Sequence, residues 1–368
     1  MAGFPFMRQA EAFRSSLPFI LLLAVFILPC PMSAAAKPRP AIAFVHLLLP
    51  PGGEPHASPT GWIGSLDRAR DTLESLRIPT IVSSASPGNA EDLNELSEMD
   101  PEVLITTSPL LYAAACDVAK RSPNTVFFAC TDETVHDNMS GFQARTYEAH
   151  YLAGLIAGAL SEDGVIGYLA NDPYQSKPSR LRNANAFTLG AQKSKAAIRV
   201  LYAPGNDPDE ELKTLIAAGA DIVDLERALP SLVERLREHS VRYVGTAGRT
   251  VDPLCLAAPE WEWSNAFGDL LTQVRFGIWR PRNVSYGIKE GVVGLSPFGP
   301  AVPETVRVRV REAKKAIRNG VSPFEGPVRD VSGSLRIAEG SVPDDATLRG
   351  MDWRVQGLEP LPLTPDGL

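Results

Sequence analysis

Two successive series of alternating strand and helix patterns constrain the fold of this chain more than any other feature. The expected strands of the first series are Ala41–Leu49, Thr80–Val82, Val103–Thr106 and Thr125–Cys130. Those of the second series are Val165–Leu169, Ile198–Tyr202, Ile222–Leu225 and Arg242–Gly245. Strands that alternate with helices build βαβ units, whose strands pair in a mainly parallel sheet. The sequence therefore predicts an α/β protein with two similar lobes.

The segment Tyr147–Leu160 stands between the two series and is apolar on nearly every side. A helix of this kind is buried between other elements. We interpret His150, which lies on it, as a packing histidine rather than a ligand. The small residues of the segment would let a neighbouring element approach closely, and they are Ala149, Ala153, Gly154, Ala157 and Gly158.

Residues 1–36 have the pattern of a cleavable signal peptide. Basic residues precede the apolar run Leu17–Leu28, and the small-x-small pattern that ends at Ala36 suits signal peptidase. We therefore expect cleavage after Ala36 and a mature protein in the periplasm. One alternative is a retained membrane anchor, for which the apolar run is short. Another is a lipid on Cys30, although Pro29 departs from the small residue of a lipobox.

The charge balance and the motifs that the sequence lacks argue against several functions. A net charge of -7 argues against a nucleic-acid binder, which normally carries a basic face. The sequence contains no G-x-S-x-G elbow, no Walker phosphate loop and no G-x-G-x-x-G between a strand and a helix. Its five histidines are scattered and form no metal-ligand spacing. We therefore expect neither an enzyme, nor a cofactor, nor a metal site.

The residues that follow the expected strands are the candidates for ligand binding. In doubly wound folds, ligands bind outside the carboxyl ends of the parallel strands. These candidates are Thr107, Ser108, Asn171, Asp172, Glu226 and Thr246, with Tyr147 at the start of the apolar helix. Trp62, Trp261 and Trp263 could stack on a flat heteroaromatic ring. The alternative is that each tryptophan packs between a helix and a sheet.

Several segments together carry a resemblance to a known family. They are Tyr147–Leu160, Asn185–Gln192, Leu215–Asp221, Trp261-Glu262-Trp263, Lys289–Pro303, Phe324–Pro327 and Met351-Asp352-Trp353. In this order they resemble the basic membrane protein (BMP) family, the substrate-binding proteins of ABC transporters that include purine nucleoside receptors. The resemblance covers nearly the whole mature chain. The Trp-x-Trp and Pro-Phe-Gly-Pro segments are most similar to members that bind a free purine base such as adenine.

This resemblance implies a type I periplasmic-binding fold. Two Rossmann-like lobes would close on a ligand in the cleft between them, and three hinge crossovers would join the lobes, the first near Phe142–Arg145. The expected lobes are residues 37–143 with about 246–280, and residues 144–245 with about 281–330, followed by an extension over 331–368 that packs on them. The resemblance also implies delivery of a small molecule to the permease subunits of an ABC transporter. We expect the protein to be a monomer.

Departures from the family pattern bear on the ligand. Asp224-Leu225-Glu226 stands where the family usually has Thr-Asp-Ser, and Gly245-Thr246-Ala247-Gly248 stands where many members have Tyr-Asp-x-Asp. Family members hold a nucleoside partly by carboxylates on the ribose, so these replacements favour a purine base over a nucleoside.

For such a base, Trp62 and Trp261 are expected to stack on the ring, while Asn171, Asp172 and Glu226 bond its edges. An acidic side chain accepts from an exocyclic amine, which favours adenine. The alternatives are a ligand-sensing receptor module and a secreted α/β enzyme that acts on nucleosides.

Overall fold

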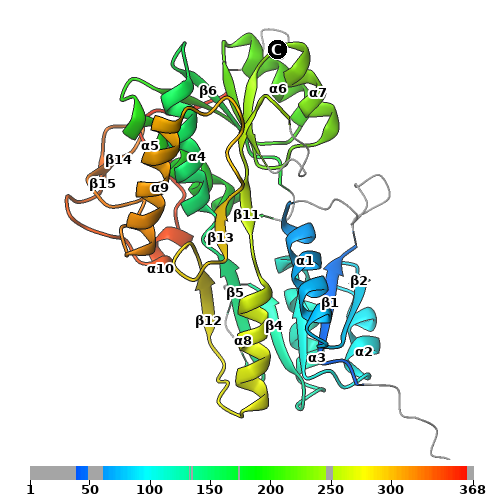
Figure 1. Ribbon diagram of the computed structural model, residues 1–368. Coiled ribbons are helices and arrows are strands. Elements are labelled where there is room, and N and C mark those ends of the chain that lie inside the picture. Colours follow the sequence, from blue (N-terminus) through cyan, green and yellow to red (C-terminus); the bar gives the residue numbers. More distant parts are fainter. Residues whose placement is uncertain are drawn as a thin grey trace, which may run out of the picture. The chain divides into compact units, whose positions relative to one another are not determined.

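Two parallel β-sheets, each of six strands within the described residues, form the framework of the computed structural model (Figure 1). The structure describes residues 39–48, 61–131, 133, 136–172, 175–245 and 252–362. Both sheets belong to one compact unit, Pro38–Leu368. The expected signal peptide, Cys30 and Thr246 lie outside the described residues.

The first sheet has the strand order β12-β5-β4-β3-β1-β2, and all its strands are parallel. Its strands are β1 (Ile42–Leu47), β2 (Thr80–Ala85), β3 (Val103–Thr106), β4 (Val126–Cys130), β5 (Met139–Ala144) and β12 (Asn283–Tyr286). The helical elements associated with it are α1 (Gly61–Ser75), α2 (Glu91–Ser97), η1 (Pro109–Leu111), α3 (Tyr112–Ala119) and α8 (Ser264–Arg275). Alternate residues of β1 point to opposite faces, so Phe44 packs with α1 and α8, and Val45 with α2 and α3.

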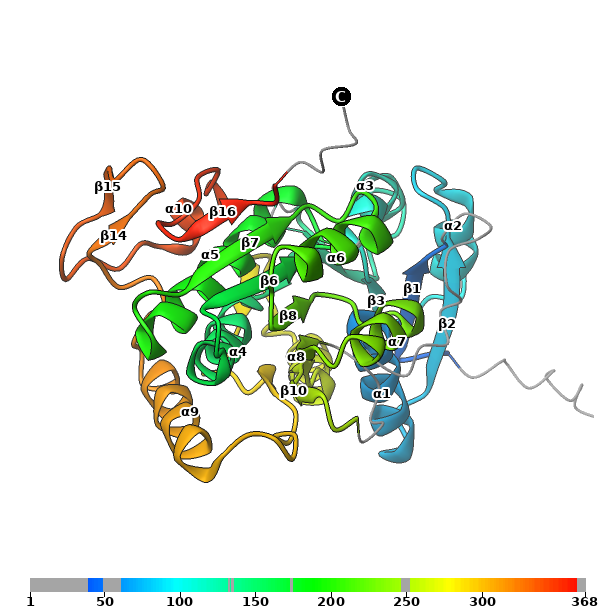
Figure 2. The same ribbon diagram turned by 90° about the horizontal axis from the view of Figure 1, so that it is seen from above.

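The second sheet has the strand order β10-β9-β8-β6-β7-β16, which Figure 2 shows from above, and it is also parallel. Its strands are β6 (Val165–Leu169), β7 (Arg199–Ala203), β8 (Ile222–Leu225), β9 (Arg242–Gly245), β10 (Cys255–Ala257) and β16 (Leu358–Pro360). One face packs against α4 (Tyr147–Leu160) and α5 (Lys177–Ser194), and the other against α6 (Pro208–Ala217) and α7 (Pro230–Glu238). The two α/β lobes predicted from the sequence are confirmed.

The remaining elements are short apart from one helix. They are α9 (Glu304–Arg318), α10 (Asp345–Arg349), the antiparallel pair β11 (Pro259–Trp261) and β13 (Val293–Leu295), and the antiparallel pair β14 (Val328–Arg329) and β15 (Leu335–Ile337). Within the described ranges, no helix has the length and apolar character needed to cross a bilayer.

Helices α4 and α5 approach each other closely through the small residues of α4. A Cβ atom at Gly154 would lie 2.0 Å from the Phe187 carbonyl oxygen, and one at Gly158 would lie 2.2 Å from the Ala191 carbonyl oxygen. Only glycine fits at such an approach, because any larger side chain would overlap the backbone of α5. The close neighbour expected for this buried helix is therefore α5.

Along the described residues, the chain passes between the two sheets three times. It crosses after β5 into α4, after β10 through β11 into α8, and after β12 through β13 towards α9. The second and third crossings pair with each other through the antiparallel strands β11 and β13. The first is held to the third by Arg145, which donates to the Ser285 carbonyl oxygen at 2.7 Å and pairs with Glu148 and Glu290.

The expected lobe boundaries were wrong at two short strands. Strand β10 continues the second sheet beside β9, although residues 246–280 were assigned to the first lobe. Strand β12 extends the first sheet beside β5, although residues 281–330 were assigned to the second. The reason is that the second crossing comes after β10 and the third comes after β12. The extension over 331–368 contributes β16, which pairs with β7.

Candidate functional site

Trp62 meets Trp261 and Trp263, which lie about 200 residues further along the chain, in one aromatic cluster that also includes Phe142. The ring centroids of Trp62 and Trp261 are 5.8 Å apart at an interplanar angle of 83°. Those of Trp62 and Trp263 are 5.2 Å apart at 82°. Rings in these edge-to-face pairs attract each other, because the positive edge of one meets the negative face of the other.

This geometry changes the expected role of the tryptophans. Because the rings of Trp62 and Trp261 are nearly perpendicular, they do not form two parallel faces that could sandwich a flat ligand. Trp263 is fully buried and stacks on Phe267 with a centroid distance of 5.5 Å, so it belongs to the core of the first sheet. Trp261 is also buried, whereas Trp62 is only half-buried. Trp62 therefore retains the most exposed indole surface of the three.

Trp62 is fixed by the residues that follow β3. Its Nε1–H donates to the Thr107 carbonyl oxygen at 2.8 Å. The Thr107 hydroxyl donates to the Val45 carbonyl oxygen at 3.1 Å, and the Ser108 hydroxyl accepts from the Leu110 amide at 3.3 Å. Thr107 and Ser108 are buried. Their side chains therefore serve to shape the loop that orients Trp62.

A group of buried acids occupies the face of the second sheet that packs against α4 and α5. Asp224 lies on β8, and Glu226 is the first residue after this strand. Because alternate residues of a strand point to the same face, the side chains of Asp224 and Glu226 share one face of the sheet. His150 Nδ1 on α4 lies 3.1 Å from Asp224 Oδ2. The Tyr168 hydroxyl donates to Glu226 Oε1 at 2.8 Å. We call Asp172, Asp224 and Glu226, with His150, the acidic cluster.

Burial changes the protonation of the acidic cluster. Removal from water raises the pKa of Glu226 from 4.5 to about 7, and the nearby His150 opposes this rise. Burial alone would lower the pKa of His150, but the carboxylates of Asp224, Glu226 and Asp172 together outweigh it and raise the pKa. Near neutral pH, Glu226 is therefore populated in both its charged and its neutral form, and it can accept or donate a hydrogen bond.

Asn171 and Asp172 follow β6, and Asp172 is the member of the acidic cluster that this loop supplies. The Asn171 amide donates to the Arg227 carbonyl oxygen at 2.8 Å and accepts from the Arg227 amide at 2.9 Å. Both polar atoms of Asn171 are thus engaged in joining the loops after β6 and β8. Asp172 is buried and accepts from Gln175 Nε2 at 3.1 Å.

The first turn of α4 connects the aromatic and acidic clusters. Trp261 Nε1–H donates to the Thr146 hydroxyl at 3.3 Å, and Thr146 immediately precedes α4. The His150 amide donates to the Thr146 carbonyl oxygen at 3.2 Å, so the two residues stand one helical turn apart. An indole surface and a set of hydrogen-bonding acids are therefore attached to the same short stretch of backbone.

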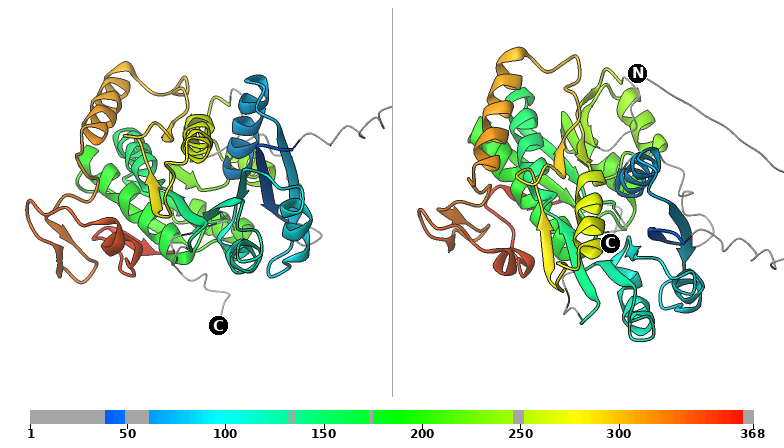
Figure 3. Two further views of the ribbon diagram at one scale, coloured as in Figure 1. Left: turned by 90° about the horizontal axis from the view of Figure 1, so that it is seen from below. Right: turned by 60° about the horizontal axis from the view of Figure 1, so that its bottom comes forward.

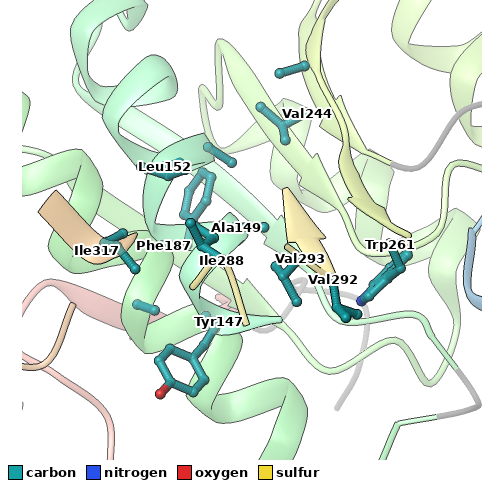
Figure 4. Packing of buried hydrophobic residues seen from close by; sticks show 14 of the residues in the cluster. Tyr147, Ala149, Leu152, Phe187, Val244, Trp261, Ile288, Val292, Val293 and Ile317 are labelled. Carbon is teal, nitrogen blue, oxygen red and sulfur yellow. The ribbon is translucent and has the colours of Figure 1, made fainter. Parts of the chain in front are cut away.

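Tyr147 belongs to neither cluster, although it lies on the same turn. It packs against Phe324 at a centroid distance of 5.4 Å, and the guanidinium carbon of Arg182 lies 5.6 Å from the centre of its ring. Figure 4 shows this ring pointing away from Trp261, which lies beside Val292 and Val293. Thr246, the last expected site residue, lies outside the described residues.

Sequence reasoning missed several polar residues at this site. Thr146, Tyr168 and Asn183 supply hydrogen bonds that hold Trp261 and Glu226. Their side chains reach the clusters through tertiary contacts, which local patterns do not encode. One sequence pattern did indicate the acidic cluster. Asp224 and Glu226 are two acids at alternate positions in and just after a strand that is otherwise apolar. In the part of the chain that the structure describes, no group of His, Cys, Asp and Glu is arranged to hold a metal ion.

Comparisons with known proteins show what this chain is similar to. A family model described as "ABC transporter substrate-binding protein PnrA-like" matches residues 66–217. A purine-binding protein of Brucella abortus is 28% identical over 344 residues, which cover 89% of this chain and 95% of that protein. A protein of Haloferax volcanii, named as the glucose-binding protein of an ABC transporter, is 28% identical over 307 residues, covering 77% of this chain and 78% of its own.

A solved structure supports the fold. The solute-binding protein of an ABC transporter from Conexibacter woesei superposes with a TM-score of 0.60 at 17% identity. The superposition covers 76% of this chain and 97% of that one. The type I periplasmic-binding architecture expected from the sequence is thereby confirmed.

Proposed function

We propose that this chain is an ABC transporter substrate-binding protein of the PnrA-like Bmp family, and that it binds a free purine base such as adenine and delivers it to a permease. Substrate-binding proteins of ABC importers work outside the cytoplasm, so we place the protein in the periplasm, as a monomer exported by residues 1–36. The proposal depends mainly on one observation, the α4 turn from Thr146 to His150 that joins the indole cluster to the buried acids.

A purine base needs a flat apolar surface, and Trp62 is the residue that offers one. Its indole is half-buried and held in place by the hydrogen bond to Thr107, so little side-chain freedom would be lost when a ring stacks on it. Stacking of a base on an aromatic side chain contributes roughly 1–3 kcal/mol in nucleic-acid complexes.

The edge of the base needs hydrogen-bonding partners, and Glu226 suits adenine. Adenine carries an exocyclic amine, which donates, beside ring nitrogens, which accept. With its pKa at about 7, the Glu226 carboxyl accepts from the amine when charged and also donates to a ring nitrogen when neutral. Hypoxanthine has a carbonyl in place of that amine, and the charged carboxylate has no proton to donate to it, so the charged form favours adenine. Asn171, which the sequence also suggested for the ring edge, already uses both amide atoms on Arg227.

The ligand is tested by thermal unfolding of the purified protein with adenine, hypoxanthine, adenosine and glucose. A ligand at 100 times its dissociation constant adds about 2.7 kcal/mol of stability. We expect the largest upward shift of Tm with adenine. The relative from Haloferax volcanii makes glucose the informative competitor. A response to glucose and to none of the purines would contradict the proposal.

Variants of the site separate binding from folding. Replacement of Trp62 by leucine should weaken adenine binding by about 5- to 150-fold, which corresponds to a loss of about 1–3 kcal/mol. The matched control is Trp353→Leu, since this half-buried tryptophan lies in the extension near Asn185. Equal loss of affinity in both variants would show that Trp62 has no specific contact with the base.

Delivery to a permease distinguishes transport from the alternative of a sensory receptor. Cells that lack the gene should take up labelled adenine slowly, and the wild-type gene should restore uptake whereas Trp62→Leu should not. If binding is normal but deletion leaves uptake unchanged, the protein serves a receptor rather than a transporter. The proposed role involves no chemical change of the ligand, so adenosine should be recovered intact after incubation.

A further inference from the structure

The loop between α8 and β12, residues 276–282, exposes large apolar side chains at its tip. Phe276 is 75% exposed and Ile278 is 64% exposed, although both are side chains that folding normally buries. Figure 1 shows this loop projecting at the lower end of α8, and Figure 3 shows it from below. We call it the α8–β12 loop. Exposed apolar groups that are gathered in one loop mark a surface that contacts something else.

The charge of the same segment is unusual for this chain. Residues 270–289 contain Arg275, Arg280, Arg282 and Lys289 and no acidic residue, whereas the whole chain has a net charge of -7. Arg275 is paired with Glu102. Arg280 donates to the carbonyl oxygen of Trp279 at 2.6 Å, and Arg282 donates to Gln273 Oε1 at 3.4 Å. These two exposed guanidinium groups thus keep their positive charge beside neutral oxygen atoms.

The loop lies at the amino ends of the strands of the first sheet. The Arg282 amide donates to the Ser140 hydroxyl at 3.2 Å, and Ser140 is at the start of β5. Arg39, which leads into β1, pairs with Asp100 just before β3 at the same edge.

We propose that the α8–β12 loop is a contact surface for a phospholipid bilayer with anionic headgroups. Phe276 and Ile278 would enter the interfacial region, while Arg280 and Arg282 pair with lipid phosphates. Aromatic and aliphatic side chains flanked by arginine suit this boundary, where an apolar zone lies directly beneath negative charge. The carboxyl ends of the strands, where the proposed ligand lies, are at the opposite edge of the sheet. Lipid contact is therefore independent of the identity of the ligand.

Vesicle binding tests this proposal. The protein is expressed from its full coding sequence, and all variants are purified from the same export fraction so that they share one N-terminus. Vesicles of phosphatidylcholine alone are compared with vesicles that also contain phosphatidylglycerol. We expect binding to the anionic vesicles that weakens as salt is raised. The variant Phe276→Ser/Ile278→Ser should reduce the partition coefficient at least about tenfold. Arg280→Gln/Arg282→Gln should reduce it about tenfold and flatten the salt dependence.

Matched controls separate the loop from general surface effects. Val321 and Val342 are 47% and 56% exposed at other places, so Val321→Ser/Val342→Ser should bind vesicles as the wild type does. A second measurement does not depend on the N-terminus. Brominated lipid should quench the fluorescence of the tryptophan introduced by Phe276→Trp, and it should not quench that of the tryptophan introduced by Val321→Trp. Absence of this quenching, or equal binding by the wild type and the Phe276→Ser/Ile278→Ser variant, would overturn the proposal. Binding only to vesicles that carry the permease would also overturn it, in favour of a protein partner.

Discussion

Replacement of Glu226 by glutamine gives the sharpest test of the acidic cluster. Glutamine has nearly the same shape, and its carbonyl oxygen can still accept from the Tyr168 hydroxyl and from Asn183. The substitution therefore removes the charge and the titration of this group without creating a cavity. Any difference between the two proteins that depends on pH then belongs to Glu226 and to the groups coupled with it.

The size of the effect follows from the pKa of Glu226. Its rise from 4.5 to about 7 corresponds to about 3 kcal/mol, at about 1.36 kcal/mol for each pKa unit. Because the pKa is raised in the folded state, the native protein keeps a proton that the unfolded chain has already lost. The stability that this proton provides is present at low pH and falls as pH rises through the window from 4.5 to about 7. The raised pKa of His150 acts in the same direction.

Urea unfolding at about pH 5 and about pH 8 measures this difference. On going from the lower to the higher pH, the wild type should lose about 2.5 kcal/mol more than Glu226→Gln. The control is Glu238→Gln, in which an exposed acid at the end of α7 is replaced. It should follow the wild-type profile. If Glu226→Gln follows it too, the carboxyl is not desolvated in the folded protein, and Glu226 does not recognise adenine in two protonation states.

Two further substitutions test the packing and the crossings. Gly154→Ala places a Cβ against the Phe187 carbonyl oxygen and should lower the free energy of unfolding by about 1–3 kcal/mol or more. Its control, Gly268→Ala on α8, meets open space and should raise the free energy of unfolding by about 0.5–1 kcal/mol. Equal effects of the two substitutions in urea unfolding would refute the close approach of α4 and α5. Arg145→Gln leaves the carboxylate of Glu148 buried without its cation and should lower the free energy of unfolding by about 3–5 kcal/mol. An unchanged midpoint of urea unfolding would show that the ion pair does not hold the crossings together.

Local sequence patterns predicted the framework of the fold because a parallel sheet covered on both faces needs continuous apolar strands. Val103–Thr106 and Ile222–Leu225 are recognisable for this reason, and both strands have the bounds that were expected. The short strands β10 and β12 carry too few residues to show which sheet they join. Their partners depend on where the chain crosses between the sheets, and that is a property of the tertiary structure. This is why the lobe boundaries were misplaced there.

The site was predictable only in outline. Topology places Glu226 and Asn171 at the carboxyl ends of neighbouring strands, and the structure has them there. The sequence could not show that both polar atoms of the Asn171 side chain bond to the backbone of Arg227, because residues 171 and 227 are far apart along the chain. The interpretation of His150 as a buried packing residue was correct for its burial, but its contact with Asp224 depends on how α4 lies on the sheet.

The position of the α4 turn suggests how ligand binding would reach the hinge. Arg145, which ties the first crossing to the third, directly precedes Thr146 and lies one turn of chain before the acidic cluster. A ligand that touched both Trp62 and Glu226 would contact α1, which packs on the first sheet, and the residue that follows β8 of the second sheet, on either side of this crossing. Its affinity would then differ between relative orientations of the two sheets. Binding would shift the protein towards the orientation with the higher affinity, to the extent that the affinities differ. A ligand that touched the aromatic cluster alone would provide no such difference, so under the proposed function the acidic cluster would be the part of the site that couples recognition to closure.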